Sequence, residues 1–184
     1  MKVLAIYGSS RANGNTDHLT DLVVEGLPCT KIYLRDKRIE AIEDRRHTAE
    51  GFQPVDDDYD QVISEVLSHD ILIFATPLYW YGMSGRMKDF VDRWSQSLRD
   101  KPNFKEEMSR KKGYVIIVGG DNPRVKALPL VQQFQYIFDF VSIDFGGYVI
   151  GSANRPGDIM GDDRALFEAR KMKEEIVQLL NQRK

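Results

Sequence analysis

The chain has 184 residues, enough for one hydrophobic core, and we expect a single domain over residues 1–184. Its formal net charge of -2 at pH 7 argues against a nucleic-acid binder, which needs a basic surface to neutralise phosphates, and weakly against a strongly acidic carrier. The single cysteine, Cys29, allows no internal disulfide and no cysteine-held cluster, so we expect a cytoplasmic protein. No apolar run reaches the roughly 20 residues that span a bilayer, so we expect no membrane partner.

Five short apolar runs alternate with segments of helical periodicity. Most of the runs are apolar throughout, which is typical of strands buried on both faces of a parallel sheet. They lie at residues 3–7, 30–34, 71–75, 114–118 and 148–151. Apolar stripes at helical spacing follow Thr16 and the segment DDDYD, and others cover residues 83–94, 130–141 and 166–180; we attribute all of them to core packing.

The alternation of strand and helix predicts right-handed crossovers and an α/β doubly wound sheet. Five strands in such a sheet suggest the order 2-1-3-4-5. The segment from Lys37 to Val55 is polar and has no clear period, so we interpret it as a long excursion after the second strand.

The segment YGSSRANGNT, residues 7–16, leaves the first predicted strand through small polar residues and two glycines. Ligands of doubly wound sheets bind beyond the carboxyl ends of the strands, and the free N–H groups of a following helix attract an anion. Thr16 is a candidate N-cap for that helix, and Arg11 adds a positive charge. This composition favours a phosphate site, with a plain strand-to-helix turn as the alternative.

Three other phosphate motifs do not fit the chain. A Walker loop needs four residues between its glycines, whereas Gly8 and Gly14 are separated by five. The dinucleotide fingerprint G-x-G-x-x-G fails because Ser10 stands at its second glycine. Cys29 and Arg35 have the spacing of a cysteine phosphatase loop, but the intervening TKIYL contains no glycine and is predicted to be a strand.

Two further loops are predicted at the same edge of the sheet. The aromatic residues Tyr79, Trp80 and Tyr81 follow the third strand, and large rings in a loop need a surface to cover, either a flat ligand or a partner subunit. The fourth strand is followed by GGDNPR, which has two glycines and little bulk. A phosphate at one end and a planar ring at the other describe flavin mononucleotide (FMN).

The segments GSSRANGNT, TPLYWYGMSGRMKDFVDRW and GGDN together resemble the flavodoxin-like NAD(P)H-dependent FMN reductases, above all the branch related to iron–sulfur flavoproteins. The resemblance implies a flavodoxin-like three-layer sandwich, FMN as cofactor and NAD(P)H as co-substrate. Family members pair through the region of Phe90, Val91 and Trp94, which implies a homodimer or homotetramer. It also implies that the FMN phosphate lies on Ser9, Arg11, Asn15 and Thr16, that Pro77, Leu78, Tyr79, Trp80, Tyr81 and Gly82 line the isoalloxazine, and that Gly119, Gly120 and Asp121 lie by its pyrimidine edge.

The chain departs from the iron–sulfur branch in the excursion after the second strand. Those relatives have a compact cysteine cluster there, whereas this excursion contains no cysteine, so an iron–sulfur cluster would have no ligands. His47 is expected to be exposed to solvent, and DDDYD is interpreted as a charged helix start; we expect no metal site.

The resulting hypothesis is an FMN-dependent NAD(P)H oxidoreductase. Hydride passes from the nicotinamide to flavin N5, and electrons continue to a small acceptor such as a quinone, an azo or nitro aromatic, or free flavin. This chemistry demands no side-chain acid or base, and we assign no catalytic residue. The alternatives are a flavodoxin-type electron carrier without NAD(P)H oxidation of its own and a flavin-free module whose aromatic loop is only an oligomer interface. The acceptor and the choice between NADH and NADPH stay open.

Overall fold

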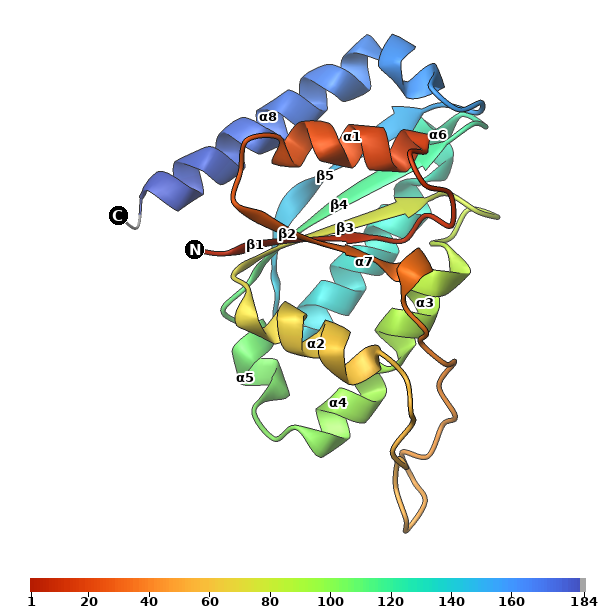
Figure 1. The fold of residues 1–184 in the computed structure, drawn as a ribbon, viewed down its shortest axis with the longest axis vertical. Coiled ribbons are helices and arrows are strands. Elements are labelled where there is room, and N and C mark those ends of the chain that lie inside the picture. The colour runs from red at the N-terminus through yellow and green to blue at the C-terminus, as the bar shows by residue number, and fades with distance from the viewer. Residues whose placement is uncertain (183–184) are drawn as a thin grey trace.

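A five-stranded parallel sheet forms the centre of the structure, a computed structural model that describes residues 1–182 (Figure 1). Its strands are β1 (Val3–Tyr7), β2 (Cys29–Tyr33), β3 (Ile71–Pro77), β4 (Lys112–Gly119) and β5 (Asp144–Ser152). They pair in the order β2-β1-β3-β4-β5, which confirms the predicted topology. In register, Val3 stands between Cys29 of β2 and Ile71 of β3.

Helices cover both faces of the sheet and complete three layers (Figure 1). Helices α1 (Asn15–Val24) and α8 (Asp163–Asn181) lie on one face. The other face is covered by α2 (Tyr59–Ser68), α3 (Gly85–Asp92), α4 (Trp94–Asp100), α5 (Phe104–Met108) and α7 (Leu128–Val141). The short helix α6 (Pro123–Lys126) and two 3-10 turns, η1 (Leu34–Asp36) and η2 (Asp158–Gly161), complete the fold. Within residues 1–182 no helix is both long enough and apolar enough to cross a bilayer.

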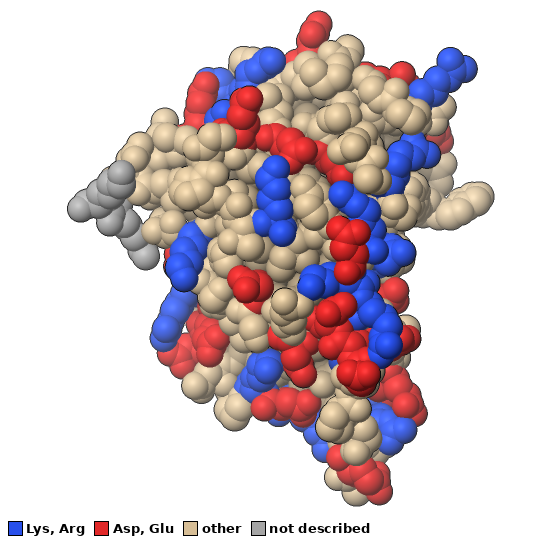
Figure 2. All heavy atoms as spheres, in the orientation of Figure 1, with Lys and Arg blue, Asp and Glu red and all other residues tan. Residues whose placement is uncertain are grey.

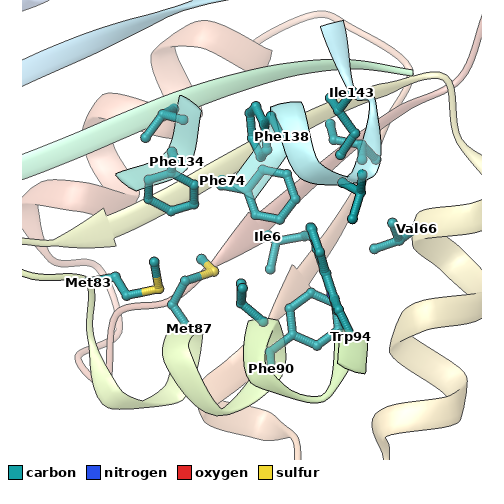
Figure 3. Packing of buried hydrophobic residues seen from close by; sticks show 14 of the residues in the cluster. Ile6, Val66, Phe74, Met83, Met87, Phe90, Trp94, Phe134, Phe138 and Ile143 are labelled. Atoms are coloured by element: carbon teal, nitrogen blue, oxygen red, sulfur yellow. The ribbon is translucent and has the colours of Figure 1, made fainter. Parts of the chain in front are cut away.

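The two faces of each central strand enter two different cores. Leu4 and Ile6 of β1 pack with α2, α3 and α7, whereas Val3, Ala5 and Tyr7 pack with α1 and α8. Figure 3 shows the first core, where rings from β3, α3 and α7 pack together with Trp94 at the start of α4. Burial on both faces explains why the strands are apolar throughout instead of alternating.

Several boundaries differ from the sequence-based expectation, among them β2, which begins and ends one residue earlier, and β3, which extends to Pro77. Strand β5 begins at Asp144 instead of residue 148. The glycine at position 146 interrupts the apolar run on which the prediction relied. A Cβ at Gly146 would lie 2.5 Å from the Tyr114 ring, so close packing requires glycine there. Strand β4 is likewise longer at both ends than residues 114–118. The prediction of Thr16 as N-cap is wrong, because the extended Gly14 occupies that position and Thr16 is already inside α1.

The excursion between η1 and α2 is held by two arginines. Arg93, whose side chain is 4% exposed, forms a 2.7 Å ion pair with Asp57. The Arg99 guanidinium donates to three carbonyls near the tip of the excursion, those of Arg45, Arg46 and Thr48. These contacts give a defined path to a segment without helix or strand.

Candidate functional site

A cleft lies beyond the carboxyl ends of β1, β3, β4 and β5, where the loops that follow these strands meet. One part of it, the first-loop cleft, has a volume of about 290 Å³. A neighbouring part of about 350 Å³, the aromatic cleft, shares Leu78, Gly120 and Asn154 with it, so the two form one continuous site. The first-loop cleft is lined by Ser9, Arg11, Gly14, Asn15, Thr16, Pro77, Leu78, Tyr79, Val118, Gly119, Gly120, Ala153 and Asn154, and the aromatic cleft by Leu78, Trp80, Tyr81, Gly120, Asp121 and Asn154.

The first loop presents hydrogen-bond donors to its cleft. The first-turn N–H groups of α1 have no partner within the helix, which leaves them free for an anion. The buried Ser9 hydroxyl accepts from the Arg11 amide at 3.2 Å and lies 3.1 Å from the Arg11 carbonyl, so it fixes the turn before the helix. Within residues 1–182 the exposed Arg11 guanidinium has no carboxylate partner. The loop thus combines backbone donors with one available cation.

A largely buried ion pair, with Arg35 partly exposed, braces this loop from behind. Asp17 Oδ2 accepts from Arg35 at 2.9 Å and from the amide of Asn13 at 3.2 Å, while Arg35 also reaches the Arg11 carbonyl at 3.4 Å. The Arg35 guanidinium lies 4.2 Å from the centre of the Tyr33 ring. Burial raises the pKa of the Asp17 carboxyl, against the opposing effect of Arg35, and its Oδ1 has no partner among the described residues. The pair therefore fixes both the middle and the end of the loop.

The aromatic loop is a tight turn with strained central residues. The amides and carbonyls of Tyr79 and Gly82 bond reciprocally at 2.9 and 3.0 Å. Trp80 and Tyr81 both have positive φ, at 48° and 63°, a backbone conformation that costs roughly 1–2 kcal/mol per residue with a side chain. This turn holds the Trp80 side chain 96% exposed at the mouth of the cleft. Strain of this kind is typical of ligand-binding loops.

A polar contact joins the loops after β3 and β4 across the aromatic cleft. The Tyr81 hydroxyl donates to Asp121 at 2.9 Å, and Lys126 donates to the same carboxylate oxygen. Lys126 also lies 5.4 Å from the centre of the Tyr81 ring. These hydrogen bonds hold the pKa of Asp121 below its ordinary value, and the bond from Lys126 has a larger effect than the bond from Tyr81. The carboxylate at this rim is therefore ionised and its charge is balanced.

Two glycines line the wall shared by the clefts, and neighbouring side chains pack closely against them. A Cβ at Gly119 would lie 3.0 Å from the Leu78 side chain, and a Cβ at Gly120 would lie 3.1 Å from the side chain of Asn154. Glycine at these positions lets Leu78 and Asn154 pack against the backbone, and both glycines line the first-loop cleft. A helix N-terminus, a strained aromatic turn and two glycines thus converge on one site.

The family model of the NADPH-dependent FMN reductases matches residues 1–155 of the chain. The chain belongs to this family. Over 174 residues it is 54% identical to YwqN of Bacillus subtilis, which carries the name of an NAD(P)H-dependent FMN-containing oxidoreductase; the match covers 94% of this chain and 96% of YwqN. As a member of this family, the protein is an NAD(P)H-dependent flavin oxidoreductase, as predicted.

Two further similarities agree with this assignment. The solved structure of the Trp repressor binding protein from Bacillus subtilis superposes with a TM-score of 0.80 at 51% identity, covering 93% of the reductase and 99% of that chain. The iron–sulfur flavoprotein MJ1083 of Methanocaldococcus jannaschii is 28% identical over 195 residues, covering 98% of the reductase and 97% of that protein. The predicted resemblance to the branch related to iron–sulfur flavoproteins is confirmed.

The structure of the reductase brings every residue predicted for the site to the joined clefts except Gly82, which closes the aromatic turn and faces a groove on its other side. Asn15 lies at the cleft, but its side chain is engaged elsewhere. Its Nδ2 donates to the Arg155 carbonyl at 2.8 Å, and its Oδ1 accepts from the amides of Gly157 and Ile159 at 3.0 and 3.3 Å. Its carboxamide therefore ties the first loop to the loop after β5.

Sequence reasoning missed the wall of the cleft that follows β5, formed by Ala153 and Asn154. The rule that located the other three loops applies to the segment SANRPG after the fifth strand as well, so its position was the available signal. It also missed the Asp17–Arg35 brace and Lys126. The first depends on a bond between residues 18 positions apart, and the second on where the loop after β4 meets the Tyr81 ring.

Proposed function

We propose that the protein transfers electrons from NAD(P)H to a small planar acceptor, such as a quinone, an azo or nitro aromatic, or free flavin, through FMN held in the joined clefts of one domain. The observation that carries this proposal is the convergence of the free N–H groups of α1 and the aromatic turn on one open cleft. Bound FMN supplies the capacity to accept hydride from one molecule and to give electrons to another.

FMN fits the residues that line the clefts. Backbone N–H groups at the start of α1, with Ser9 and Arg11, provide the donors and the positive charge that a phosphate needs. Gly119 and Gly120 line the cleft beside Leu78 without side chains of their own, which favours a flat ring at this wall. We propose that the site residues predicted from the sequence hold the cofactor in this way, with Asn15 acting through its backbone amide because its side chain is engaged.

The rim of the aromatic cleft supports a planar acceptor. Trp80 and Tyr81 present large rings at an open edge, with exposed fractions of 96% and 47%. Planar rings gain from offset stacking on such surfaces. Lys126 is paired with Asp121 at this edge, so the exposed rings provide the main contact surface for such an acceptor.

We also propose that two copies of this chain associate, in the cytoplasm, through the groove beside the aromatic turn. This groove has a volume of about 680 Å³ and lies between α3, α4 and α7. Its exposed rings include Tyr136 and Phe140 of α7, and a monomer gains nothing from exposing them together. Light scattering coupled to size-exclusion chromatography tests the assembly, and a monomer at micromolar concentration would contradict it.

The test of the electron acceptor is a measurement of NAD(P)H oxidation without oxygen. The purified protein, saturated with FMN, is mixed with NADPH or NADH and then with a quinone, an azo dye, a nitroaromatic or free flavin. We expect at least one planar acceptor to raise the oxidation rate well above the rate without acceptor. If none does so, the proposed acceptor class is wrong.

A further inference from the structure

A basic hollow lies beside the first loop, on the side away from the aromatic cleft. Its volume is about 500 Å³, and it carries four cationic side chains, those of Arg35, Lys37, Arg38 and Arg86. Figure 2 shows basic and acidic side chains gathered over this part of the face, near η1 and the start of the excursion. The proposed FMN site does not use this hollow.

The hollow and the FMN cleft share the first loop as a common wall. Arg35, at the edge of the hollow, donates to the Arg11 carbonyl at 3.4 Å. On the other side, Ser84 donates to the Gly8 carbonyl at 2.7 Å, and Arg86 follows two residues later in the first turn of α3. A ligand that leaves the cleft across the first loop therefore meets this hollow.

Two of the guanidinium groups have donors to spare. Among residues 1–182, the only hydrogen bond made by the exposed Arg86 side chain is to the Leu34 carbonyl at 3.3 Å. Arg38, whose side chain is 63% exposed, has loose contacts at 3.5 Å with Glu40 and 3.7 Å with Asp56, both too long for strong hydrogen bonds. Guanidinium groups with free N–H pairs match the oxygens of a phosphate.

Carboxylates neutralise part of the charge of the hollow. Asp17 pairs with Arg35 and Asp58 lies 4.0 Å from Lys37, which leaves Arg38 and Arg86 as the cations without a close ion pair. A dianionic group gains charge-assisted hydrogen bonds from the spare N–H groups of Arg38 and Arg86, whereas a neutral hydroxyl gains much less.

The nicotinamide coenzymes differ by one such group. NADPH has a phosphate on its adenosine 2′-oxygen where NADH has a hydroxyl, and arginine is a usual partner of that phosphate. Strand β2, which leads into the hollow, is two positions from β3, which leads into the aromatic turn. At a strand spacing of about 4.8 Å this separation is roughly 10 Å, which an extended dinucleotide can cross.

We propose that Arg38 and Arg86 bind the 2′-phosphate of NADPH and so set a preference for NADPH over NADH. The inference rests on the proposed function, because it requires the nicotinamide end of the coenzyme to reach the aromatic cleft. It assigns a specific role to the junction of η1 and the excursion, and it separates coenzyme selection from FMN binding. Arg35 is excluded from the test because it braces the first loop.

The experiment compares two nucleotides that lack a nicotinamide, so that no turnover is needed. Calorimetric titration of the FMN-saturated protein with 2′,5′-ADP and with 5′-AMP measures the affinity due to the 2′-phosphate. We expect 2′,5′-ADP to bind at least about tenfold more tightly, as one charge-assisted contact permits. The variant Arg38→Gln/Arg86→Gln should bind the two nucleotides within about twofold of each other, and its NADPH-to-NADH ratio of kcat/KM should fall about tenfold.

The matched control is Arg110→Gln, which removes an exposed arginine paired with Glu106 on α5, far from the cleft. It should keep the wild-type difference between the nucleotides, and an unchanged thermal midpoint shows that each variant is folded. Equal binding of 2′,5′-ADP and 5′-AMP by the wild type, or an unchanged difference in the double variant, overturns the inference. These outcomes leave the proposed function intact, whereas failure to bind FMN or to oxidise either coenzyme overturns the function itself.

Discussion

Replacement of Arg35 by alanine isolates the brace behind the first loop. The side chains of Arg35 and Asp17 are 15% and 4% exposed, so the substitution strands a buried carboxylate. Loss of one partner of a fully buried pair costs about 3–5 kcal/mol in the free energy of unfolding. Because Arg35 is partly exposed and Asp17 can take up a proton, we expect a loss of about 2–3 kcal/mol at pH 8.

The loss should depend on pH in a defined direction. A carboxyl whose pKa is higher in the folded state than in the unfolded state favours folding at low pH, and this contribution is lost as the pH rises through the folded pKa. Burial already raises the pKa of Asp17, and Arg35 is the main influence that lowers it. Without Arg35 the folded pKa rises further, so the difference in stability between wild type and variant should be larger at pH 8 than at pH 5.

Urea unfolding at the two pH values provides the measurement. A second variant, Asp17→Asn in the Arg35→Ala background, should recover about 1–2 kcal/mol at pH 8, because it removes the stranded charge while its amide oxygen can still accept from Asn13. The affinity for FMN should fall about tenfold in Arg35→Ala, since the loop loses its brace at the Arg11 carbonyl. A loss of stability that is equal at both pH values and is not recovered by Asp17→Asn would refute this account.

The remaining predictions concern the cofactor cleft and the single thiol. Arg11→Ala should weaken FMN binding about tenfold or more with little change in the free energy of unfolding, whereas Arg110→Ala should change neither; quenching of FMN fluorescence measures the affinity. Gly120→Val should also weaken FMN binding, because its side chain would enter the cleft beside Asn154, and unchanged affinity would place the ring elsewhere. Burial raises the pKa of Cys29 to about 11, so iodoacetamide should label the native protein slowly at pH 8 and faster as the pH rises towards that value; complete labelling within minutes at pH 8 would contradict this.

The sheet could be predicted from the sequence because its signal is local. Each central strand is an apolar run whose two faces enter two cores, as Leu4 and Val3 on opposite faces of β1 illustrate. The prediction failed where a strand contains glycine for close packing, as at Gly146. The rule that loops meet at the carboxyl edge then placed the candidate site residues together without knowledge of any contact.

What the sequence could not show is how the loops are held. Thr16 has the residue type of an N-cap, yet α1 begins earlier because Gly14 adopts the capping position and the Asn15 carboxamide bonds to the loop after β5. Asp17 and Arg35 are 18 residues apart and meet only when β1 and β2 pair. Such long-range contacts form only in the folded chain, so the sequence alone does not predict them.

The excursion after β2 shows how this chain orders a segment that contains no cysteine. Arg93 reaches Asp57 at the return of the excursion and the Glu40 carbonyl at its start, and Arg99 supports its tip. Both arginines lie at or next to α4, whose other side contributes to the groove proposed for self-association. The excursion begins at the basic hollow, since Arg38 and Glu40 belong to both. Side-chain contacts between the excursion and α4 therefore connect the proposed coenzyme-selecting residues to the proposed subunit interface. The excursion has this structural role although it contains no cysteine.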